Sequence, residues 1–513
     1  MIYPIGIQNF EKIRNDGYVY VDKTARIHQL ATTGCYYFLS RPRRFGKSLL
    51  ISTMDAYFSG KRELFKGLAI DHLDDKWTVH PVLRLDLNTA KYDSKEALER
   101  VLDDTLKKWE NLYGTSPTEP TLELRFLGVV ERAAKQTGQR VVILVDEYDK
   151  PLLQALGNEP LLNEYRKTLK AFYSVLKTQD EFIKFGFLTG VTKFSKVSIF
   201  SDLNNLQDIS MDERYIDICG VSETELHDYF DTSVKDLAEA NGLSLEDCYA
   251  RLKEKFDGYH FEYGTIGIYN PFSLLNTFAK RKFRDYWFES GTPTFLVELM
   301  KHTDYDLRKL QEEEVTADVL NSIDTMTSNP IPVLYQSGYL TIKGLDEQFG
   351  LYRLGFPNDE VEQGFVRFLL PCYTPLDSNG GVFFISKFVR DVQQGNVEGF
   401  LERLQTMFED NDYRVAGKLE LYFQNMMYVI FKMMGFYVQV ERATARGRID
   451  VTIQTPDYIY IIEIKLDGSA DAALQQIEEK GYAKPFATDS RKLYKIGLNF
   501  SSESRSINEW KVG

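Results

Sequence analysis

Residues 35–50 read "CYYFLSRPRRFGKSLL" and combine a strand, a short loop and the start of a helix. The apolar run 35–40 predicts a buried strand, and the pattern of 47–60 predicts an amphipathic helix. A Gly-Lys-Ser sequence closes the loop, directly before the first turn of the helix. Backbone N–H groups at a helix N-terminus bind phosphate oxygens, so this strand–loop–helix unit indicates an α/β fold with an anion site.

The loop predicts a phosphate-binding site for ATP and Mg²⁺. Lys47 has the position from which a lysine reaches the terminal phosphates, and the Ser48 hydroxyl can complete a Mg²⁺ shell. The usual pattern has a glycine five residues before Gly46, where this chain has Arg41, so the match is incomplete. A basic surface loop is the alternative explanation. The candidate nucleotide-binding residues of the loop are Arg43, Arg44, Phe45, Gly46, Lys47, Ser48 and Leu49.

A second apolar strand, "VVILVDE" at 141–147, carries the acidic residues that such a site requires. This pattern assigns Asp146 to Mg²⁺, through water or through the Ser48 hydroxyl, and Glu147 to the attacking water. A solvated strand end is the alternative explanation of the two acids. This alternative explanation is weaker because the loop comes first, between a strand and a helix, and the two acids follow at the end of a later strand, as a nucleotide site requires.

The strand predicted at 182–191 supplies a further candidate. Thr189 or Thr192 is expected to contact the γ-phosphate, as a polar residue at that strand end does in AAA-type ATPases. Lys193 and Lys196 are weaker candidates for a phosphate contact. A strand end rich in Thr and Gly is also compatible with a simple turn.

Strands and helices alternate in the first third of the chain, which predicts an α/β domain with a largely parallel sheet. From about Asp217 the alternation fades and helices are expected, among them "TPTFLVELMKH" at 292–302. The segment 334–361, "LYQSGYLTIKGLDEQFGLYRLGFPNDEV", predicts the end of a helix and then a hairpin. Such a unit suits a small winged-helix-like lid.

A second charged site is expected near the end of the chain. Residues 458–467, "YIYIIEIKLD", predict an apolar strand with Glu463 and Lys465 on one face, since strands alternate with period two. A turn brings Asp450 of the preceding strand close to Glu463. Adjacent carboxylates repel unless a cation lies between them, and Mg²⁺ is the usual choice for oxygen ligands. Lys465 can then orient or deprotonate a water for attack on a phosphodiester.

The alternative for this strand is a salt-bridged pair at its end. Three other residues extend the site hypothesis. Glu420, on a helix upstream of Asp450, is a candidate metal ligand, and Gln476 and Tyr482 are expected on the helix that follows the strand. Ordinary surface and packing positions explain each of these three residues equally well.

The bulk composition excludes several classes of protein. The 513 residues predict two to four domains, and 43% hydrophobic with 27% charged residues is ordinary for a globular protein. No apolar run approaches the roughly 20 residues of a membrane span, and no signal peptide is recognisable. Four cysteines far apart favour reduced thiols and a cytoplasmic location. The net charge of −13 argues against a general nucleic-acid coat protein.

Several stretches together resemble a family of bacterial AAA-ATPase-like proteins with a C-terminal PD-(D/E)XK nuclease-superfamily domain. The stretches are "YVDKT" (20–24), "RPRRFGKS" (41–48), "DEYDKP" (146–151), "LTGVTKFS" (188–195), "YNPFSLLN" (269–276), "YQSGYLTI" (335–342) and "GRIDV…YIIEIK" (447–465). The resemblance implies a multidomain α/β protein. Its parts are a P-loop AAA/STAND-like ATPase core at 1–216, a helical and winged-helix-like lid at 217–375, a linker at 376–410 and a restriction-endonuclease-like domain at 411–513.

The resemblance also implies roles. Lys47, Ser48, Asp146 and Glu147 would serve ATP and Mg²⁺, and Asp450, Glu463 and Lys465 would form the nuclease core, with Glu420 as an additional ligand. No arginine finger can be assigned from the sequence. The candidates for that role are Arg41, Arg43, Arg44 and Arg214.

Two hypotheses remain open at this point. The first is an ATP- and Mg²⁺-dependent enzyme whose nucleotide state gates cleavage of nucleic acid, with DNA as the first expectation, in defence or mobile-element biology. The second is a STAND-like regulatory switch whose nuclease fold is silent and binds DNA or a partner. Self-association into a homo-oligomer is compatible with both, and no membrane partner is expected.

Overall fold

In the computed structural model the chain forms two compact units. The first comprises Met1–Leu299 and Gln311–Val361, and the second comprises Met300–Leu310 and Glu362–Gly513. The structure describes residues 1–194, 205–289, 299, 305–311, 313–321, 323, 329–374, 378–409, 419–445 and 448–513. At the ends of some of these ranges, Glu420 and Asp450 included, it describes the backbone and not the side chain.

The first unit is built on a parallel sheet of five strands in the order β2-β3-β4-β1-β5. Its strands are β1 (Tyr36–Ser40), β2 (Val82–Asp86), β3 (Val141–Asp146), β4 (Ile183–Gly190) and β5 (Gln207–Asp208). All six residues of β3 and seven of the eight of β4 are buried. Continuous apolar strands are typical of a parallel sheet that is covered on both faces. The predicted α/β class with a parallel sheet is therefore confirmed for this unit.

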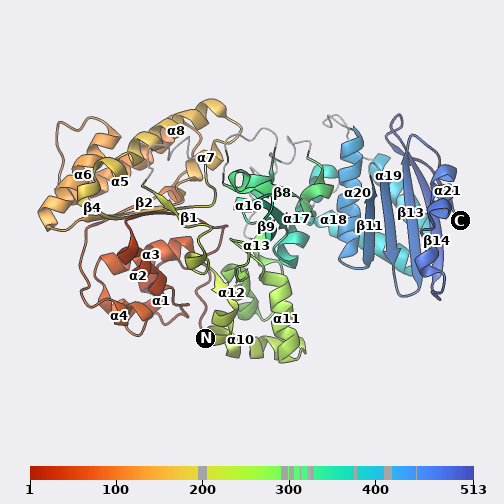
Figure 1. The fold of residues 1–513 in the computed structure, drawn as a ribbon, viewed down its shortest axis with the longest axis horizontal. Helices are drawn as coiled ribbons and strands as arrows, with labels where there is room; N and C mark the ends of the chain where they lie inside the picture. Colours follow the sequence, from red (N-terminus) through yellow and green to blue (C-terminus); the bar gives the residue numbers. More distant parts are fainter. Residues whose placement is uncertain are drawn as a thin grey trace. The chain divides into compact units, whose positions relative to one another are not determined.

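Helices cover both faces of this sheet (Figure 1). The helices of the core are α1 (Phe10–Asn15), α2 (Thr24–Thr33), α3 (Lys47–Phe58), α4 (Ala69–Leu73), α5 (Lys95–Tyr113), α6 (Leu122–Thr137), α7 (Lys150–Gln154), α8 (Glu159–Tyr173) and α9 (Val175–Thr178). Helices α2 and α3 lie on one side, and α5, α6 and α8 lie on the other (Figure 1). The layers therefore place β1, its loop and α3 at the centre of the unit.

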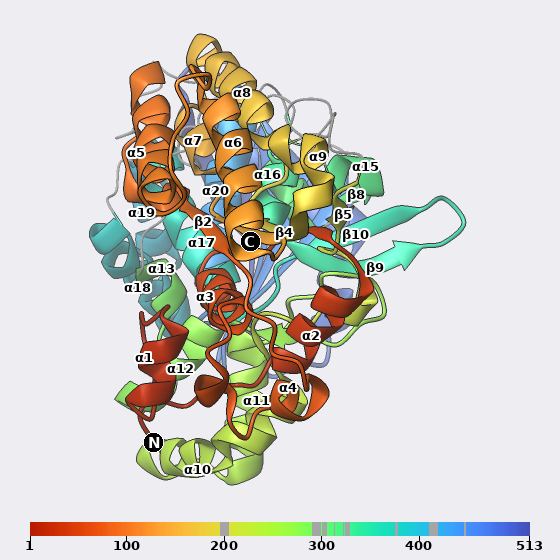
Figure 2. The ribbon, with the colours of Figure 1, turned by 90° about the vertical axis from the view of Figure 1, so that its left-hand side faces the viewer.

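Helices dominate the rest of the first unit. They are α10 (Glu223–Asn241), α11 (Leu245–Phe256), α12 (Pro271–Lys280), α13 (Tyr286–Glu289), α15 (Ala317–Leu320) and α16 (Ile331–Gln336). The small strands are β6 (Val221–Ser222), β7 (Ile268–Tyr269), β8 (Glu314–Thr316), β9 (Thr341–Asp346) and β10 (Leu351–Gly355). The last two form the antiparallel hairpin that the sequence predicts after a helix end, and this hairpin projects from the unit (Figure 2). Most of the helix predicted at 292–302 lies outside the described residues.

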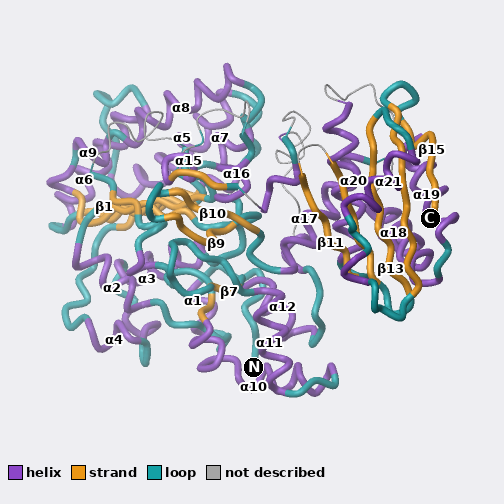
Figure 3. The backbone as a smooth tube through the Cα atoms, turned by 45° about the vertical axis from the view of Figure 1, so that its right-hand side comes forward, coloured by secondary structure: helices purple, strands orange, loops and turns teal. Residues whose placement is uncertain are grey.

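The second unit contains a mixed sheet in the order β11-β12-β13-β14-β15 (Figure 3). Its elements are α17 (Asp359–Tyr373), α18 (Ser378–Gln394), α19 (Val397–Glu409), α20 (Leu419–Gly435), β11 (Gln439–Ala445), β12 (Arg448–Gln454), β13 (Tyr458–Leu466), α21 (Ala470–Lys480), β14 (Lys492–Ser501) and β15 (Ser506–Val512). Only β13 and β14 are parallel, and α21 connects them. This arrangement is consistent with a nuclease fold.

The boundary between the units falls inside α17, between Val361 and Glu362. Helices α18 and α19, which lie in the segment interpreted as a linker, contribute apolar side chains to the core of the second unit. The four-part division of the chain stays a prediction. In the part of the chain that the structure describes, no helix is both long enough and apolar enough to span a membrane.

Candidate nucleotide site and candidate nuclease site

Strand β4 lies between β1 and β3, so three strand ends meet at one edge of the sheet. The first end leads into the loop of Lys47, the second into Asp146 and Glu147, and the third carries Thr189. Ligands bind at this carboxyl edge in open α/β sheets. The topology thus collects the residues that the sequence predicts for one site, although about 100 residues separate the loop from the acidic pair.

The loop before α3 exposes a row of hydrogen-bond donors. Among the described residues, no acceptor is found for the backbone N–H groups of 43–48. Gly46 has φ +94°, and a Cβ built there would meet no atom within 4 Å. The left-handed backbone therefore requires the glycine, while the space beside it stays open to the cleft. Six consecutive free donors at a helix N-terminus form a receptor for an anion.

Lys47 is buried (4% exposed), and its ammonium group lies across the loop. Its Nζ donates to the carbonyl oxygens of Arg41 at 3.1 Å and of Pro42 at 3.2 Å. Glu147 Oε1 lies 3.7 Å from the same nitrogen. The cation is therefore placed between the loop and the acidic strand end.

Arg41, which takes the place of the usual first glycine, is a structural residue. It is 1% exposed and donates to the carbonyl oxygens of Ser40, Ser210 and Tyr215. Its guanidinium carbon lies 3.9 Å from the ring centroid of Phe261, and burial lowers the pKa of Arg41 to about 10. A buried arginine that is held by three carbonyl groups of its own chain is not exposed to a neighbouring molecule, so Arg41 is wrong as a candidate arginine finger.

The other loop side chains have different surroundings. Phe45 is 1% exposed and packs edge-to-face on Tyr259 and Phe261, so only its backbone can meet a ligand in the cleft. Arg44 is exposed and lies over the ring of Phe272. Arg214 pairs with Asp212, two residues earlier in the chain. Of the residues predicted in the loop, Phe45 is thus the one whose side chain points into the protein.

Asp146 and Thr189 form a buried pair. The Thr189 hydroxyl donates to Asp146 Oδ1 at 2.8 Å, and the two residues are 0% and 1% exposed. Glu147 follows with φ +54°, a left-handed conformation that is rare for a residue with a side chain. The strand end is thus turned so that Glu147 lines the cleft, whereas Thr189 acts on Asp146.

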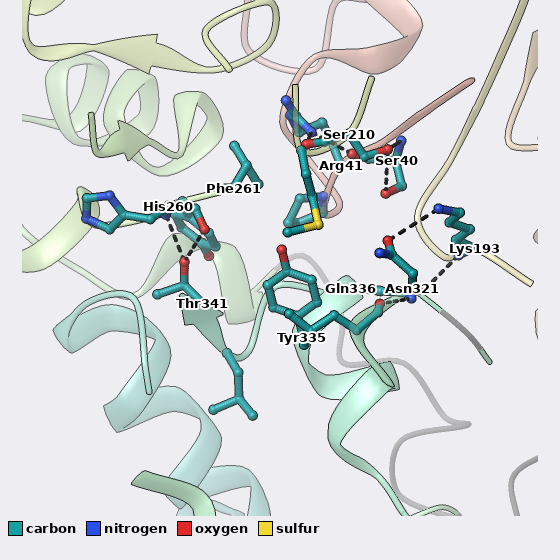
Figure 4. A pocket seen from close by; sticks show the side chains of 15 residues that line it. Ser40, Arg41, Lys193, Ser210, His260, Phe261, Asn321, Tyr335, Gln336 and Thr341 are labelled. Atoms are coloured by element: carbon teal, nitrogen blue, oxygen red, sulfur yellow. Dashed lines mark hydrogen bonds between the residues drawn. The ribbon is translucent and has the colours of Figure 1, made fainter. Parts of the chain in front are cut away.

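Thr192 and Lys193, the other candidates for a phosphate contact at this strand end, each have partners within the protein. Asp149 Oδ2 accepts hydrogen bonds from the hydroxyl and the N–H group of Thr192, and burial raises the pKa of Asp149 to about 6. Lys193 is paired with Asp208 and donates to Asn321 in a separate pocket behind the loop (Figure 4). Lys196 lies outside the described residues.

The cleft at the loop encloses about 1220 Å³ of space, open solvent included. Besides the predicted residues, it is lined by segments that the sequence analysis did not assign: 4–8, Asn88, Lys150 and the start of α12 at Pro271 and Phe272. An apolar cavity of about 630 Å³ shares Pro4, Gly46 and Leu49 with it. Three of these residues, Lys150, Pro271 and Phe272, occur in the stretches "DEYDKP" and "YNPFSLLN". The resemblance of these stretches to the family was the feature of the sequence that could have indicated them.

The second site lies on the hairpin of β12 and β13. Asp450 and Glu463 are directly opposed in the antiparallel register. Residues opposed in this way have Cβ atoms roughly 5 Å apart. The side chain of Asp450 lies outside the described part of the structure. The register nevertheless brings together the two carboxylate positions that the sequence predicts.

Glu463 is completely buried, and its two oxygens differ in their surroundings. Oε1 accepts from Lys465 Nζ at 2.7 Å, whereas Oε2 has no hydrogen-bond partner among the described residues. Lys465 also donates to Gln476 Oε1, and the Gln476 amide nitrogen is buried without a partner. A buried carboxylate oxygen without a partner is costly, which makes this position suitable for a cation.

Two other predictions at this site concern Glu420 and Tyr482. The side chain of Glu420 lies outside the described residues. Tyr482 follows the end of α21, which reaches only to Lys480 and has Gly481 as its C-cap, so it is not on the helix as expected. Across the described residues, no group of three His, Cys, Asp or Glu side chains is close enough to hold a metal. A complete metal shell at Glu463 would therefore require Asp450 or other ligands outside the described part.

The fold and the two sites define a P-loop-like α/β protein joined to a domain with a nuclease-like mixed sheet. Comparisons with known proteins agree with this class. Residues 4–200 match the family model described as Predicted AAA-ATPase, and residues 418–510 match that of the PD-(D/E)XK nuclease superfamily. The chain is 38% identical over 516 residues to an "Uncharacterized protein in vnfD 5'region" of Azotobacter chroococcum mcd 1.

That alignment covers 98% of this chain and 97% of the relative. No solved structure matches the chain. The chain therefore belongs to a family that joins a predicted AAA-ATPase-like domain to a C-terminal PD-(D/E)XK nuclease-superfamily domain, as the motifs predict.

Proposed function

We propose that this protein binds and hydrolyses ATP at the loop before α3, and that the nucleotide state gates cleavage of nucleic acid by its C-terminal domain. The observation that carries the first half is the row of free N–H groups at 43–48 with the Lys47 ammonium beside it. Neutral and cationic donors aimed at one space are complementary to a polyphosphate. Glu147 lines the same space and supplies the carboxylate that orients an attacking water.

A magnesium ion fits the chemistry of this site. Ser48 at the start of α3 and Asp146 at the end of β3 supply the hydroxyl and carboxylate that such an ion uses. Bound Mg²⁺ would neutralise charge on the phosphates. Thr189 holds Asp146 by a hydrogen bond, so its expected role is to orient that carboxylate. The apolar cavity of about 630 Å³ beside Gly46 offers space for the base of the nucleotide.

The second half of the proposal rests on Glu463. Its unpartnered buried oxygen and its register with Asp450 fit a divalent metal held by these two carboxylates. Such an ion would stabilise negative charge on the phosphodiester. Lys465 is held by Glu463 and Gln476, and its ammonium can orient a water or a phosphate oxygen. Nucleic acid, with DNA as the first candidate, is the substrate that this nuclease-superfamily domain implies.

The region between the two sites is proposed to serve as a lid. It combines helices α10 to α12 with the winged-helix-like unit of α16, β9 and β10. Gly338, with φ +87°, packs so closely on Pro42 that a Cβ there would lie 2.6 Å from the proline Cβ. The loop is therefore in contact with the proposed lid, which is the geometry that a nucleotide-dependent gate requires.

A second candidate function is a regulatory switch with a silent nuclease fold. The complete burial of Glu463 and its bond to Lys465 favour it, because a buried ion pair can also serve as a structural element. In that case the protein would bind and turn over ATP without cutting any nucleic acid. The C-terminal domain would then only bind DNA or a protein partner.

Nucleotide binding and cleavage measured side by side test the proposal. ATP binding is measured by calorimetry, and single- and double-stranded DNA and RNA are incubated with Mg²⁺ or Mn²⁺, with and without ATP. Lys47→Ala is expected to lose ATP binding, whereas Lys61→Ala, an exposed lysine paired with Glu11, is expected to retain it. Absence of ATP binding in the wild type would contradict the first half. ATP turnover without cleavage of any nucleic acid would contradict the second half and support the regulatory switch instead.

A further inference from the structure

Trp287 connects the phosphate loop to the helix that leads into the second unit. It lies on α13 and is 6% exposed. Its indole Nε1 donates to the carbonyl oxygen of Arg43 at 3.2 Å. Its backbone N–H donates to Glu360 Oε1 at 2.8 Å, on the first turn of α17. One residue therefore touches both the loop and the start of α17.

The bond to Arg43 acts on a peptide group between two residues that line the cleft. The peptide between Arg43 and Arg44 is trans, so its carbonyl oxygen and its N–H group point in opposite directions. When Trp287 holds the carbonyl oxygen, the N–H of Arg44 is held away from the indole. Arg44 has φ +68°, a conformation that residues with a side chain rarely adopt without support. Trp287 therefore supports a strained position of the loop.

The bond from the Trp287 N–H group to Glu360 joins α13 to the start of α17, the helix that continues into the second unit. Glu360 is 1% exposed and lies one residue before Val361, where the first unit ends. Helix α17 continues into the second unit, where Glu362 pairs with Lys432 of α20. Helix α20 directly precedes the strands of the candidate nuclease site. A change at Trp287 thus has a continuous covalent and hydrogen-bonded route towards that domain.

We propose that Trp287 is a positioning residue for the phosphate loop, and that its bond to Glu360 makes occupancy of the loop felt at the start of α17. This inference rests on the proposed function, because it requires nucleotide binding at the loop. It adds a named residue to that function and a physical link between nucleotide and cleavage. Trp287 would not touch the reacting atoms; it would act through the Arg43–Arg44 peptide.

Removal of the indole donor is the first test. Trp287→Phe keeps the aromatic ring, which packs on Tyr339, and loses the N–H group. The Kd for MgATP is expected to rise about fivefold to tenfold, because the Arg43–Arg44 peptide then has to be ordered when the nucleotide binds. The nucleotide-induced change in tryptophan fluorescence should disappear in this variant. Trp77→Phe, whose ring packs on Tyr57 and Phe65, is the matched control and should keep both properties.

Glu360 supplies a second test that leaves the indole in place. Glu360→Gln keeps the acceptor oxygen and should retain the wild-type Kd and the wild-type effect of ATP on cleavage. Glu360→Ala removes the acceptor and should reduce both the fluorescence change and the effect of ATP on cleavage by at least about threefold. If Trp287→Phe fails to fold, Glu360→Ala still decides the link to α17, and Trp287→Tyr tests the loss of the indole donor.

The outcomes separate this inference from the proposed function. ATP binding by the wild type with an unchanged Kd and fluorescence response in Trp287→Phe would overturn the positioning role and leave the function intact. An unchanged effect of ATP in Glu360→Ala would overturn the link to α17. Absence of ATP binding in the wild type would remove the proposed function, and this inference with it.

Discussion

The two candidate sites have opposite polarity. At the loop before α3, the unpaired groups are donors: the N–H groups of 43–48 beside the Lys47 ammonium. On β13, the unpaired group is an acceptor, the Oε2 atom of Glu463. A row of N–H groups at a helix N-terminus binds anions, and a buried carboxylate oxygen without a partner among the described residues is costly unless a cation completes it. The comparison therefore indicates an anion as the ligand of the first site and a cation as the ligand of the second.

The two sites also differ in how the chain builds them. The loop is a continuous segment with donors from the backbone, so its shape depends on few side chains within it. The proposed second site combines the register position of Asp450 on β12 with the side chains of Glu463 and Lys465 on β13 and of Gln476 on α21. We therefore expect the second site to be more sensitive to a single substitution than the loop.

The largest expected effect is on cleavage. Asp450→Ala and Lys465→Ala should each reduce nucleic-acid cleavage at least about hundredfold, roughly 3 kcal/mol of transition-state stabilisation, because each removes a charge at the reacting phosphate. ATP binding should stay unchanged. A gel assay of cleavage and calorimetry with ATP measure the two properties. Asp457→Ala, in the exposed turn of the same hairpin, is the matched control. Equal cleavage in Asp450→Ala and Asp457→Ala would contradict the assignment.

Glu360 extends the comparison, because it is a buried carboxylate whose partner is the Trp287 N–H group rather than a lysine Nζ. Burial raises the pKa of Glu360 from 4.5 to about 7, with Asp285 raising it and Lys255 lowering it. Between about pH 4.5 and pH 7, the Glu360 carboxyl group is protonated in the folded state and ionised in the unfolded state. Its contribution to stability is therefore complete below about pH 4.5 and is lost as the pH rises to about 7.

Urea unfolding at several pH values checks this effect. Glu360→Gln should gain stability over the wild type by roughly 1–3 kcal/mol between pH 4 and pH 8. The difference between the two free energies of unfolding should grow from about pH 4.5 to about pH 7 and stay constant above pH 7. Parallel curves of the free energy of unfolding against pH for the two proteins would show that Glu360 does not titrate in this window.

Thr189 gives a smaller effect on the first site. Thr189→Val removes the hydrogen bond to Asp146 without changing the cleft lining, so ATP hydrolysis should fall about tenfold, roughly 1.4 kcal/mol, with little change in Kd. Steady-state hydrolysis and calorimetry separate the two. The control is Thr105→Val, a threonine on α5 whose hydroxyl donates to the Val101 carbonyl. A Kd change as large as the change in rate would mean that Thr189 supports binding instead.

The smallest expected effect concerns the cation. Mn²⁺ or Mg²⁺ at about five times its Kd should stabilise the wild type by about 1 kcal/mol in thermal unfolding without nucleotide. Glu463→Gln should lose this stabilisation, because the variant no longer offers two carboxylate oxygens at the buried position. Glu478→Gln, an exposed residue on α21 that pairs with Lys495, should retain it. Equal stabilisation of all three proteins would place the cation elsewhere.

The sequence predicted contiguous features well. The strand–loop–helix unit, the parallel sheet and the hairpin at 341–355 follow from local periodicity, and the structure has all of them. The register of Asp450 with Glu463 also followed, because a short turn joins their two strands. Local pattern is sufficient where the interacting residues are close in sequence.

Long-range packing explains what the sequence could not predict. Arg41 looked like a defect in the loop, yet the carbonyl oxygens of Ser210 and Tyr215 make it a buried support. Thr192 was a candidate for a phosphate contact from its place at the strand end, but its hydroxyl donates a hydrogen bond to Asp149. Trp287 gave no local signal at all, since its partners lie 244 and 73 residues away. Hydrogen bonds between distant segments are not encoded in the spacing of a motif.

The central claim is that nucleotide binding at the loop before α3 controls cleavage of nucleic acid at the site on β13. The most direct test is the ratio of nucleic-acid cleavage rates with and without ATP at fixed Mg²⁺, in the wild type and in Lys47→Ala. We expect a ratio clearly different from one in the wild type, in either direction, and a ratio of one in Lys47→Ala. A wild-type protein that binds ATP and cleaves at the same rate with and without it would contradict the claim.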